Sequence, residues 1–447
     1  MRFSLRKLQI CAAIALSLGC SGSAPSNEPA SGGSVNGGTS SGAAAAMGGA
    51  FSSAGSPNSS GASASGGHGL AGGGVGGAAA AGAPTTGGTA GTAAGAGGVN
   101  NVAGSTPGGQ GGGAGSGGSA GTATGGAAAT PAPCDLYASE NTPCVAAHST
   151  VRALYAAYAT KLYQVRRASD NATQAIAAVM PGGPADGAAQ DAFCKGTTCV
   201  VTLVYDQSGH GNDLEYQGQG SSVGGQDKPA SATTESLTVA GHKVYSLYIN
   251  AGNSYWRDGH TTGVPLGSAP EGIYMVTSGT HVNSGCCFDY GNSETTRKAD
   301  GAGAMDAIYF GTSCWFGGCD GTGPWVQADL EYGLFPGGSK TWNPKQTPLK
   351  TKYVTAMLKN NGTTKLALKG GNAQSGGLTT LWDGALPTGY NPMKKQGAIV
   401  LGSGGDCCAT NTNQSFGTFY EGAIVSGYPS DAADAAIQNN IIAAGYQ

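Results

Sequence analysis

The sequence predicts an all-β fold, a β-sandwich with a few short helices, preceded by a disordered tether. Two observations lead to this prediction. From residue 134 onward, short runs rich in β-branched and aromatic residues alternate with Gly, Asn, Asp and Pro, which is typical of a sandwich. Residues 21–133, in contrast, are almost entirely Gly, Ala, Ser and Thr, a composition that cannot offset the entropy of ordering.

Composition and charge exclude some partners. Of 447 residues, 82 are Gly, only 11% are charged, and the formal net charge is -3. Without a basic block, this balance argues against nucleic acid as a partner and against a polybasic membrane surface.

Residues 1–20 are typical of a secretory signal peptide. Basic residues precede an apolar stretch, residues 8–18, that is too short to cross a bilayer. The end of this segment, from Ser17 to Cys20, resembles a bacterial lipoprotein cleavage box, in which Cys20 would carry the lipid, although Ser17 departs from the usual aliphatic residue. Plain secretion is the alternative. We expect a membrane contact only through such a lipid.

The next two segments differ in chemistry. Residues 21–133 indicate a flexible linker, and the alternative is a Gly-rich adhesive, without the strict Gly period of collagen. Residues 134–447 contain all five Trp and are long enough for one large domain with a continuous core.

Within 134–447 the pattern predicts two helices and several strands. Helical spacing of apolar residues predicts a helix over residues 145–163, and Ser430 is a good N-cap for a last helix. The predicted strands are CVVTLVYD, HKVYSLYI, GIYMVTSG, WVQADLE, YVTAMLK, GAIVLG and GTFYEGAIVSG.

The cysteines of this domain lie in close pairs and predict disulfides, as expected of an exported protein. The pairs are Cys134/Cys144, Cys194/Cys199, Cys286/Cys287, Cys314/Cys319 and Cys407/Cys408. The alternative is that the cysteines bind zinc, but the sequence has no repeated C-x-x-C pair accompanied by histidines, which a zinc site of this kind needs. A bridge between adjacent cysteines forms a strained ring, a feature that tends to lie at functional surfaces. The alternative is that the two adjacent pairs cross-link two loops.

Two carboxylates on one strand indicate a sugar-cleaving site, which needs a pair of acids in different environments. In the segment 325–331, Val326, Ala328 and Leu330 would occupy one face, and Asp329 and Glu331 the other, roughly 6–7 Å apart along the strand. A solvated sheet face is the alternative.

Other polar clusters are less specific. Asp406 follows the Gly-rich turn after a predicted strand, where a ligand can approach the backbone closely, although a plain turn Asp is common. Asp289 lies between Phe288 and Tyr290, and residues 205–212 indicate a structured turn. The six His show no spacing typical of a catalytic triad or a metal site.

At these residues the chain resembles the catalytic domain of the α-L-arabinofuranosidase B family, glycoside hydrolase family 54. The motifs that carry the resemblance occur in this order: PCDLYASENTPCVAAHSTVRALY, YDQSGHGN, CCFDYGNSET, GPWVQADLE, GYNPMKKQGAIVLGSGGD and GTFYEGAIVSGYPSDA. The resemblance implies a concanavalin-like jelly roll that releases terminal arabinofuranosyl residues from arabinan or arabinoxylan with retention of configuration.

The resemblance also implies residue roles. Glu331 matches the nucleophile, Asp406 the general acid/base and Asp329 a sugar-binding carboxylate, while Gly405 lies at a sugar contact. The disulfide Cys286–Cys287 and Trp315 would line the pocket, and disulfides match at Cys134–Cys144 and Cys194–Cys199.

The chain departs from the family after the nucleophile: the family usually has Asn there, whereas this chain has Tyr332, followed by Gly333, and the lost amide changes at least one hydrogen bond to the sugar. Cys314, Cys319, Cys407 and Cys408 are additions that we expect to pair around the pocket. No metal or organic cofactor is implied, and the expected partner is an arabinose-containing saccharide bound by a monomer. We expect the chain outside the cell, lipid-anchored in a bacterial envelope. The alternatives are a non-catalytic surface carbohydrate-binding module and the same fold acting on another furanoside.

Overall fold

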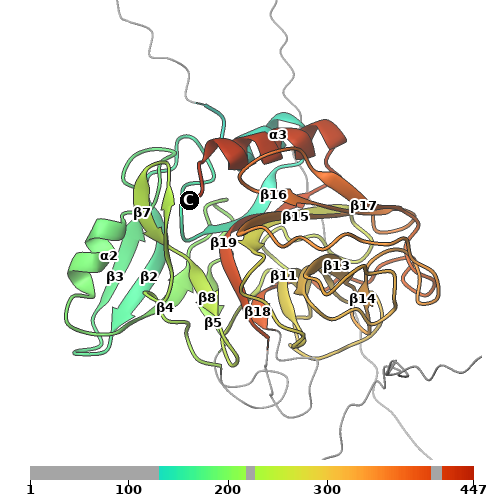
Figure 1. The fold of residues 1–447 in the computed structure, drawn as a ribbon, viewed down its shortest axis with the longest axis horizontal. Coiled ribbons are helices and arrows are strands. Elements are labelled where there is room, and N and C mark those ends of the chain that lie inside the picture. The colour runs from blue at the N-terminus through green and yellow to red at the C-terminus, as the bar shows by residue number, and fades with distance from the viewer. Residues whose placement is uncertain (1–129, 218–226, 404–414) are drawn as a thin grey trace, which may run out of the picture. The chain divides into compact units, whose positions relative to one another are not determined.

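The computed structural model describes residues 130–217, 227–403 and 415–447, which form two large antiparallel sheets and a small hairpin (Figure 1). The helices of these residues are α1 (Pro133–Ser139), α2 (Gly187–Phe193) and α3 (Asp431–Ala443). The seven-stranded sheet has the order β1 (Cys144–Ser149), β19 (Gly417–Ser426), β10 (Glu271–Ser278), β15 (Tyr353–Asn360), β16 (Leu366–Asn372) and β17 (Thr379–Gly384), with β8 (Leu247–Ile249) pairing on β19.

The ten-stranded sheet runs across the other layer. Its order is β14 (Leu334–Phe335), β13 (Trp325–Asp329), β12 (Asp306–Gly311), β11 (Phe288–Ser293), β18 (Ala398–Ser403), β9 (Ser254–Asp258), β5 (Leu214–Tyr216), β4 (Cys199–Val204), β2 (Lys161–Arg167) and β3 (Thr173–Ala177). The hairpin consists of β6 (Ser236–Val239) and β7 (His242–Tyr245). Because β12 packs over β15 and β13 over β16, the predicted β-sandwich is confirmed.

The predicted strands are confirmed as β4, β10, β13, β15, β18 and β19, and the run 242–249 divides at Ser246 into β7 and β8. The last helix is also confirmed: the Ser430 hydroxyl accepts a hydrogen bond from the amide of Ala433 at 3.0 Å. Asp431 and Asp434 of α3 bind Lys369 of β16, which holds this helix along the seven-stranded sheet (Figure 1).

The helix predicted over residues 145–163 is wrong. The chain there forms β1, then an irregular segment, then β2. Every residue of β1 is buried, because the strand pairs with β19 and is covered on both faces. Its apolar residues therefore do not alternate with polar ones, and a short continuous apolar run cannot be told from a buried helix by periodicity.

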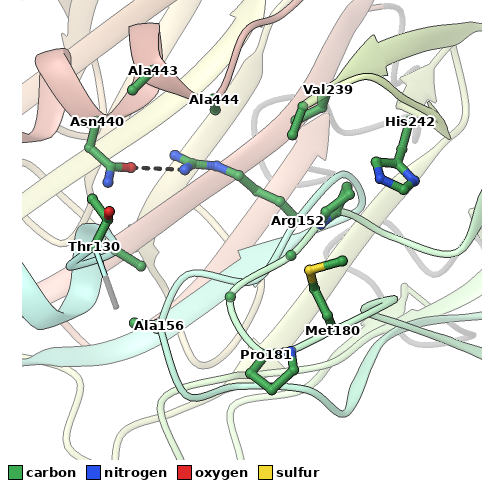
Figure 2. Close-up of a pocket in the computed structure, with 15 residues that line it drawn as sticks. Thr130, Arg152, Ala156, Met180, Pro181, Val239, His242, Asn440, Ala443 and Ala444 are labelled. Carbon is green, nitrogen blue, oxygen red and sulfur yellow. Dashed lines mark hydrogen bonds between the residues drawn. The ribbon is translucent and has the colours of Figure 1, made fainter. Parts of the chain in front are cut away.

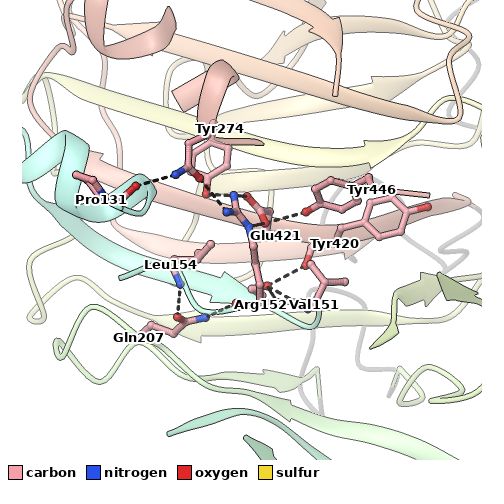
Figure 3. Close-up of polar contacts among 11 residues, drawn as sticks. Pro131, Val151, Arg152, Leu154, Gln207, Tyr274, Tyr420, Glu421 and Tyr446 are labelled. Atoms are coloured by element: carbon pink, nitrogen blue, oxygen red, sulfur yellow. Dashed lines mark hydrogen bonds and ion pairs between the residues drawn. The ribbon is translucent and has the colours of Figure 1, made fainter. Parts of the chain in front are cut away.

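A buried ion pair joins the N-terminal part of the domain to its last strand (Figure 3). The Arg152 guanidinium binds both carboxylate oxygens of Glu421 on β19, and the Tyr446 hydroxyl donates to the same carboxylate at 2.7 Å. Arg152 also donates to Asn440 of α3 at 2.8 Å. Removing one partner of such a pair leaves a buried charge uncompensated, which costs about 3–5 kcal/mol, so this network ties three distant segments together.

A second buried cluster connects the two sheets. The Lys395 ammonium lies 3.0 Å from the Glu271 carboxylate on β10 and 3.6 Å from that of Asp306 on β12. Asn292 donates to Glu271 at 3.1 Å, and Asn360 donates to Asp306 at 3.1 Å. Since two carboxylates share one ammonium in a dry site, burial raises the pKa of Glu271 to about 7 and that of Asp306 above its usual range.

None of the helices among the described residues is both long enough and apolar enough to span a membrane.

The Glu271 cluster predicts a stability that depends on pH. The folded pKa of about 7 lies above the ordinary value of 4.5, so the folded state holds a proton in this window that the unfolded chain releases. The stabilising contribution is complete below pH 4.5 and is lost as the pH rises through 7. We expect urea unfolding midpoints to fall over this range in the unmodified protein and to fall less in Glu271→Gln, which leaves Lys395 with Asp306 alone. Parallel pH curves for the two proteins would contradict this assignment.

Candidate active site

Buried carboxylates gather on the outer face of the ten-stranded sheet, the face that points away from the other sheet. On the inner face, Phe288, Ile308 and Val326 belong to the main hydrophobic core. On the outer face, Asp289 of β11 lies opposite Tyr309 of β12, which lies opposite Gln327 of β13. Alternation then places Asp329 on this same face, two residues after Gln327.

These side chains converge beside the adjacent disulfide. A carboxylate oxygen of Asp289, one of Asp329 and the Sγ of Cys287 all lie within 4.8 Å of one another. All three residues are buried. Asp289 was noted in the sequence only as part of a polar cluster, and the structure places it at the centre of the site. Its position between two core aromatic residues was the available signal, because a lone acid in an apolar strand points to the opposite face.

Glu331 does not continue the strand, which corrects the prediction that it stands beside Asp329 along β13. The strand ends at Asp329, and Glu331 and Tyr332 both adopt left-handed backbone conformations, with φ of 65° and 58°. Leu330 donates to the Gly333 carbonyl at 3.4 Å, which closes a two-residue hairpin turn into β14. Positive φ at both central residues is the geometry that fits the twist of a hairpin, but it usually takes Asn and Gly.

The turn directs the glutamate back toward the strand it leaves. The Glu331 amide donates to the Asp329 carboxylate at 3.2 Å, and the Tyr332 amide donates to the Glu331 carboxylate at 3.2 Å. The Glu331 side chain is only 6% exposed, whereas Tyr332 is 54% exposed. Left-handed backbone at a residue other than Gly costs on the order of 1–3 kcal/mol, and such strain is concentrated at functional sites.

Aromatic residues hold the turn from behind. The Tyr390 hydroxyl donates to the Glu331 carbonyl at 2.8 Å. A Cβ atom at Gly333 would lie 2.4 Å from the Phe316 ring and 2.7 Å from the Phe335 ring, so only Gly fits there. Neither Tyr390 nor Phe316 was predicted for the site, although Phe316 follows the predicted pocket residue Trp315 and Tyr390 lies in one of the family motifs.

Two tyrosines near the carboxylates stay protonated over a wide pH range. Burial, together with the charges of Asp289 and Asp329, raises the pKa of Tyr309 to about 12, although a hydrogen bond from Ser313 lowers it. Burial and then the charges of Asp329 and Glu331 also raise the pKa of Tyr390. Both hydroxyls therefore remain hydrogen-bond donors at neutral pH.

Four predicted disulfides are present among the described residues: Cys134–Cys144, Cys194–Cys199, Cys286–Cys287 and Cys314–Cys319. Cys286 is thus bonded to Cys287, and the alternative in which these two cysteines bond to another loop is wrong. Cys287 packs with Tyr309 and Leu334, the first residue of β14, so the ring lies against the site. The Cys314–Cys319 bridge closes the loop that carries Trp315, which is half exposed.

Several predicted residues lie outside the described residues: Cys20, Gly405, Asp406, Cys407 and Cys408. The strand that leads toward them is described. In β18, Gly402 is in register with Asp289, and Ser403 is in register with Phe288. The last described residue before Asp406 in the sequence is therefore a neighbour of the strand that carries the site.

The Asp289–Asp329 cluster fits a metal ion poorly. Cys287 is the third member of the group, but its sulfur is bonded to Cys286 and is no thiolate ligand. Two carboxylates remain, which is a small donor set for a resident cation.

A hollow of about 470 Å³ lies elsewhere, between the C-terminal part of α3 and the loop around Met180 (Figure 2). None of the carboxylates described above lines it. Its guanidinium, from Arg152, is already bound to Glu421 and Asn440. The carboxylate cluster, rather than this hollow, is the candidate active site.

Acidic side chains that converge at one place, as Asp289 and Asp329 do on this sheet, are the groups that a glycoside hydrolase needs on either side of the bond it breaks. Comparison with known proteins identifies the family. The model of the family described as "Alpha-L-arabinofuranosidase B, catalytic" matches residues 133–447, and the chain belongs to this family.

Known relatives agree with this assignment. The chain is 50% identical over 321 residues to the alpha-L-arabinofuranosidase B of Emericella nidulans, an alignment that covers 70% of this chain and 62% of that protein. It is 50% identical over 320 residues to a Trichoderma koningii protein named arabinofuranosidase/B-xylosidase, covering 70% and 63% of the two chains. The match thus spans less than two thirds of the relatives' own length.

Solved structures show the same fold. A glycoside hydrolase family 54 α-L-arabinofuranosidase with a Glu-to-Gln substitution, soaked with 4-nitrophenyl α-L-arabinofuranoside, superposes with a TM-score of 0.66 at 44% identity, covering 71% of this chain and 66% of that one. An arabinofuranosidase complexed with arabinofuranosyl-α-1,2-xylobiose gives a TM-score of 0.65 at 44% identity, with 70% and 65% covered.

The strained turn predicts an unusual preference at position 332. The variants Tyr332→Gly and Tyr332→Ala both lack the tyrosine ring, so the difference between their free energies of unfolding reports the backbone conformation. Because Ala at positive φ costs roughly 1–2 kcal/mol, we expect the Gly variant to be more stable than the Ala variant by about 1 kcal/mol in urea unfolding. At a residue with negative φ the order is reversed, and that reversed order here would contradict the turn geometry.

Proposed function

We propose that the chain is a retaining, exo-acting α-L-arabinofuranosidase that releases terminal arabinofuranosyl residues from arabinan or arabinoxylan. The observation that carries the proposal is the convergence of three buried acids: Asp289 and Asp329 within 4.8 Å of each other, and Glu331 hydrogen-bonded through its amide to Asp329. A retaining hydrolase needs one carboxylate that attacks and one carboxylic acid that donates a proton, about 5–5.5 Å apart.

In the proposed mechanism Glu331 is the nucleophile. Its carboxylate attacks the anomeric carbon while Asp406, protonated, gives its proton to the leaving oxygen, so the glycosidic bond breaks as a glycosyl–enzyme ester forms. Water then attacks the anomeric carbon while Asp406 takes its proton, the ester bond to Glu331 breaks and restores the carboxylate, and arabinose leaves with its original configuration. The described end of β18 beside β11 supports a place for Asp406 near the cluster.

The remaining residues would bind the sugar. Asp329, and with it Asp289, would accept hydrogen bonds from sugar hydroxyls, and the amide backbone at Gly405 would allow close approach. The Cys286–Cys287 ring and Trp315 would provide apolar contacts to a furanose face, and Tyr332 and Gly333 would shape the edge of the pocket. We propose that no cofactor takes part.

The known structures support the substrate class, since one of those proteins was soaked with an aryl arabinofuranoside and the other was complexed with arabinofuranosyl-α-1,2-xylobiose. One relative favours a second candidate function: the Trichoderma koningii protein is named for both arabinofuranosidase and xylosidase activity. A broader glycosidase that also accepts xylosides is therefore the alternative. Parallel rates on aryl arabinofuranosides, galactofuranosides and xylosides separate the two.

A non-catalytic carbohydrate-binding module remains the alternative from another class. It would share the sandwich, the disulfides and the tether, but it gives no reason to place a glutamate in a strained turn beside two further acids. Binding of arabinoxylan without release of reducing sugar would favour it.

We propose an extracellular setting, which the four disulfides among the described residues support. Three finer predictions stay predictions: a signal peptide over 1–20, a linker over 21–133, and a lipid on Cys20 that would hold the enzyme at a bacterial surface. Of these residues only 130–133 are described, and α1 already begins at Pro133. The domain boundary at 134 and the monomeric state stay predictions as well.

Substitution of the nucleophile tests the mechanism. We expect Glu331→Gln to lower kcat on 4-nitrophenyl α-L-arabinofuranoside about a thousandfold or more, because an amide cannot form the glycosyl ester. Glu215→Gln is a matched control, since Glu215 is exposed on β5 of the same sheet, and it should keep its rate. Substantial turnover by Glu331→Gln, with normal thermal unfolding, would refute the assignment.

A further inference from the structure

Exposed aromatic rings are concentrated around the candidate active site. Among the described residues, the large hydrophobic side chains that are exposed are Val179, Met180, Leu266, Trp315, Tyr332, Trp342 and Phe416. Each of the aromatic members lies on a segment that contacts the site. Tyr332 belongs to the Glu331 turn, Trp315 follows Cys314, and the Phe416 amide donates to Asn283, which also binds the amide of Gly285 before the adjacent disulfide.

Trp342 is the most exposed of these rings, at 69%, and neither the sequence motifs nor the proposed mechanism uses it. Phe416 has a packing reason for its position, because it stacks on His281, which in turn stacks on Tyr248. No such ring partner lies against Trp342 in the described part of the chain. One exposed apolar side chain is common on a protein surface, whereas several exposed aromatic rings on neighbouring segments are typical of a ligand-binding surface.

The segment that carries this indole, residues 336–346, is held rigidly against the Trp315 loop, residues 312–320. The Asn343 amide donates to the carbonyl of Phe316 at 3.4 Å and to that of Gly317 at 3.3 Å. The backbone amide of Gln346 donates to the carbonyl of Gly318 at 2.7 Å. The Trp342 amide itself is fixed by the Ser339 hydroxyl at 2.9 Å. An exposed ring on a braced loop is preorganised for binding, which reduces the entropy lost on association.

The same segment is connected to the catalytic turn. The Lys340 ammonium lies 5.3 Å from the Phe316 ring centroid and 5.7 Å from that of Tyr390. Phe316 packs on Gly333, and Tyr390 holds the Glu331 carbonyl. Lys340 thus lies against the two rings that contact the Glu331 turn, and Trp342 is two residues further along the same segment.

We propose that Trp342 is a substrate-binding platform for the polymer, stacking on a sugar ring of the leaving-group side next to the arabinose that is removed. The ligand class is a neutral pyranose or furanose unit, whose C–H face is apolar and matches the electron-rich face of an indole. This inference rests on the proposed function for its catalytic readout. It assigns the chain a preference for polymeric over small aryl substrates.

The experiment compares the full chain with Trp342→Ala and Trp342→Phe on two substrates, 4-nitrophenyl α-L-arabinofuranoside and arabinoxylan. We expect the ratio of kcat/KM on arabinoxylan to kcat/KM on the aryl glycoside to fall roughly threefold to tenfold in Trp342→Ala, through KM, and less in Trp342→Phe. Met180→Ala is the matched control, because Met180 is 54% exposed and lines the hollow of Figure 2, and it should leave the ratio unchanged. Equal losses on both substrates, or an unchanged ratio, would overturn the proposal.

A binding experiment tests the role of Trp342 independently of the proposed hydrolase activity. Retardation of the Glu331→Gln protein in native gels containing arabinoxylan should weaken when Trp342→Ala is added and stay as it is when Met180→Ala is added. If the unmodified chain cleaves no arabinofuranoside but the retardation still depends on Trp342, the hydrolase assignment fails and the platform stands. If Trp342→Ala leaves the retardation unchanged, the proposal that Trp342 binds the polymer is wrong, whether or not the chain cleaves arabinofuranosides.

Discussion

The site depends on the backbone hydrogen bonds between β11, β12 and β13, which fix the register of the outer face. That register brings Asp289 and Asp329 from strands two apart to within 4.8 Å of each other. Side chains carried on strands are held more precisely than side chains on loops, so the placement of these two acids depends on the rigidity of the sheet beneath them. The inner face supplies that rigidity, with Phe288, Ile308 and Val326 packed in the core between the sheets.

The second constraint is the hairpin turn after β13. It reverses the chain within two residues and holds Glu331 over the strand it leaves, at the cost of left-handed backbone at two residues other than Gly. Three neighbours stabilise it: Asp329 binds the Glu331 amide, Tyr390 binds its carbonyl, and Phe316 fills the space that a Cβ at Gly333 would need. The loop of Phe316 is itself closed by Cys314–Cys319 and supports the segment of Trp342. The Glu331 turn, the Cys314–Cys319 loop and the segment of Trp342 are therefore packed together as one unit.

Much of this architecture was accessible from the sequence, and the misses have physical reasons. Strands such as β10 and β15 are continuous apolar runs with clear turn residues at their ends, so both were predicted. A continuous apolar run is also the reason that β1 was not predicted as a strand, because a short buried run has the same pattern in a helix. The alternation of residues along a strand predicted the position of Asp329 correctly but not that of Glu331. The turn at Glu331 and Tyr332 has positive φ at both residues, and neither is the Gly or Asn that usually indicates such a turn. Tyr390 and Lys340 lie next to the Glu331 turn only through tertiary contacts between segments that are far apart in the sequence.

The most direct test of the account is covalent labelling of the nucleophile. An electrophilic arabinofuranose analogue forms a covalent ester with a carboxylate that is placed for attack on the anomeric carbon. After labelling and digestion, the peptide mass should place the adduct on Glu331 in the unmodified protein, and no adduct should form in Glu331→Gln. An adduct on Asp289 or Asp329, or loss of activity without any labelled carboxylate, would contradict the proposal that the turn presents the attacking group.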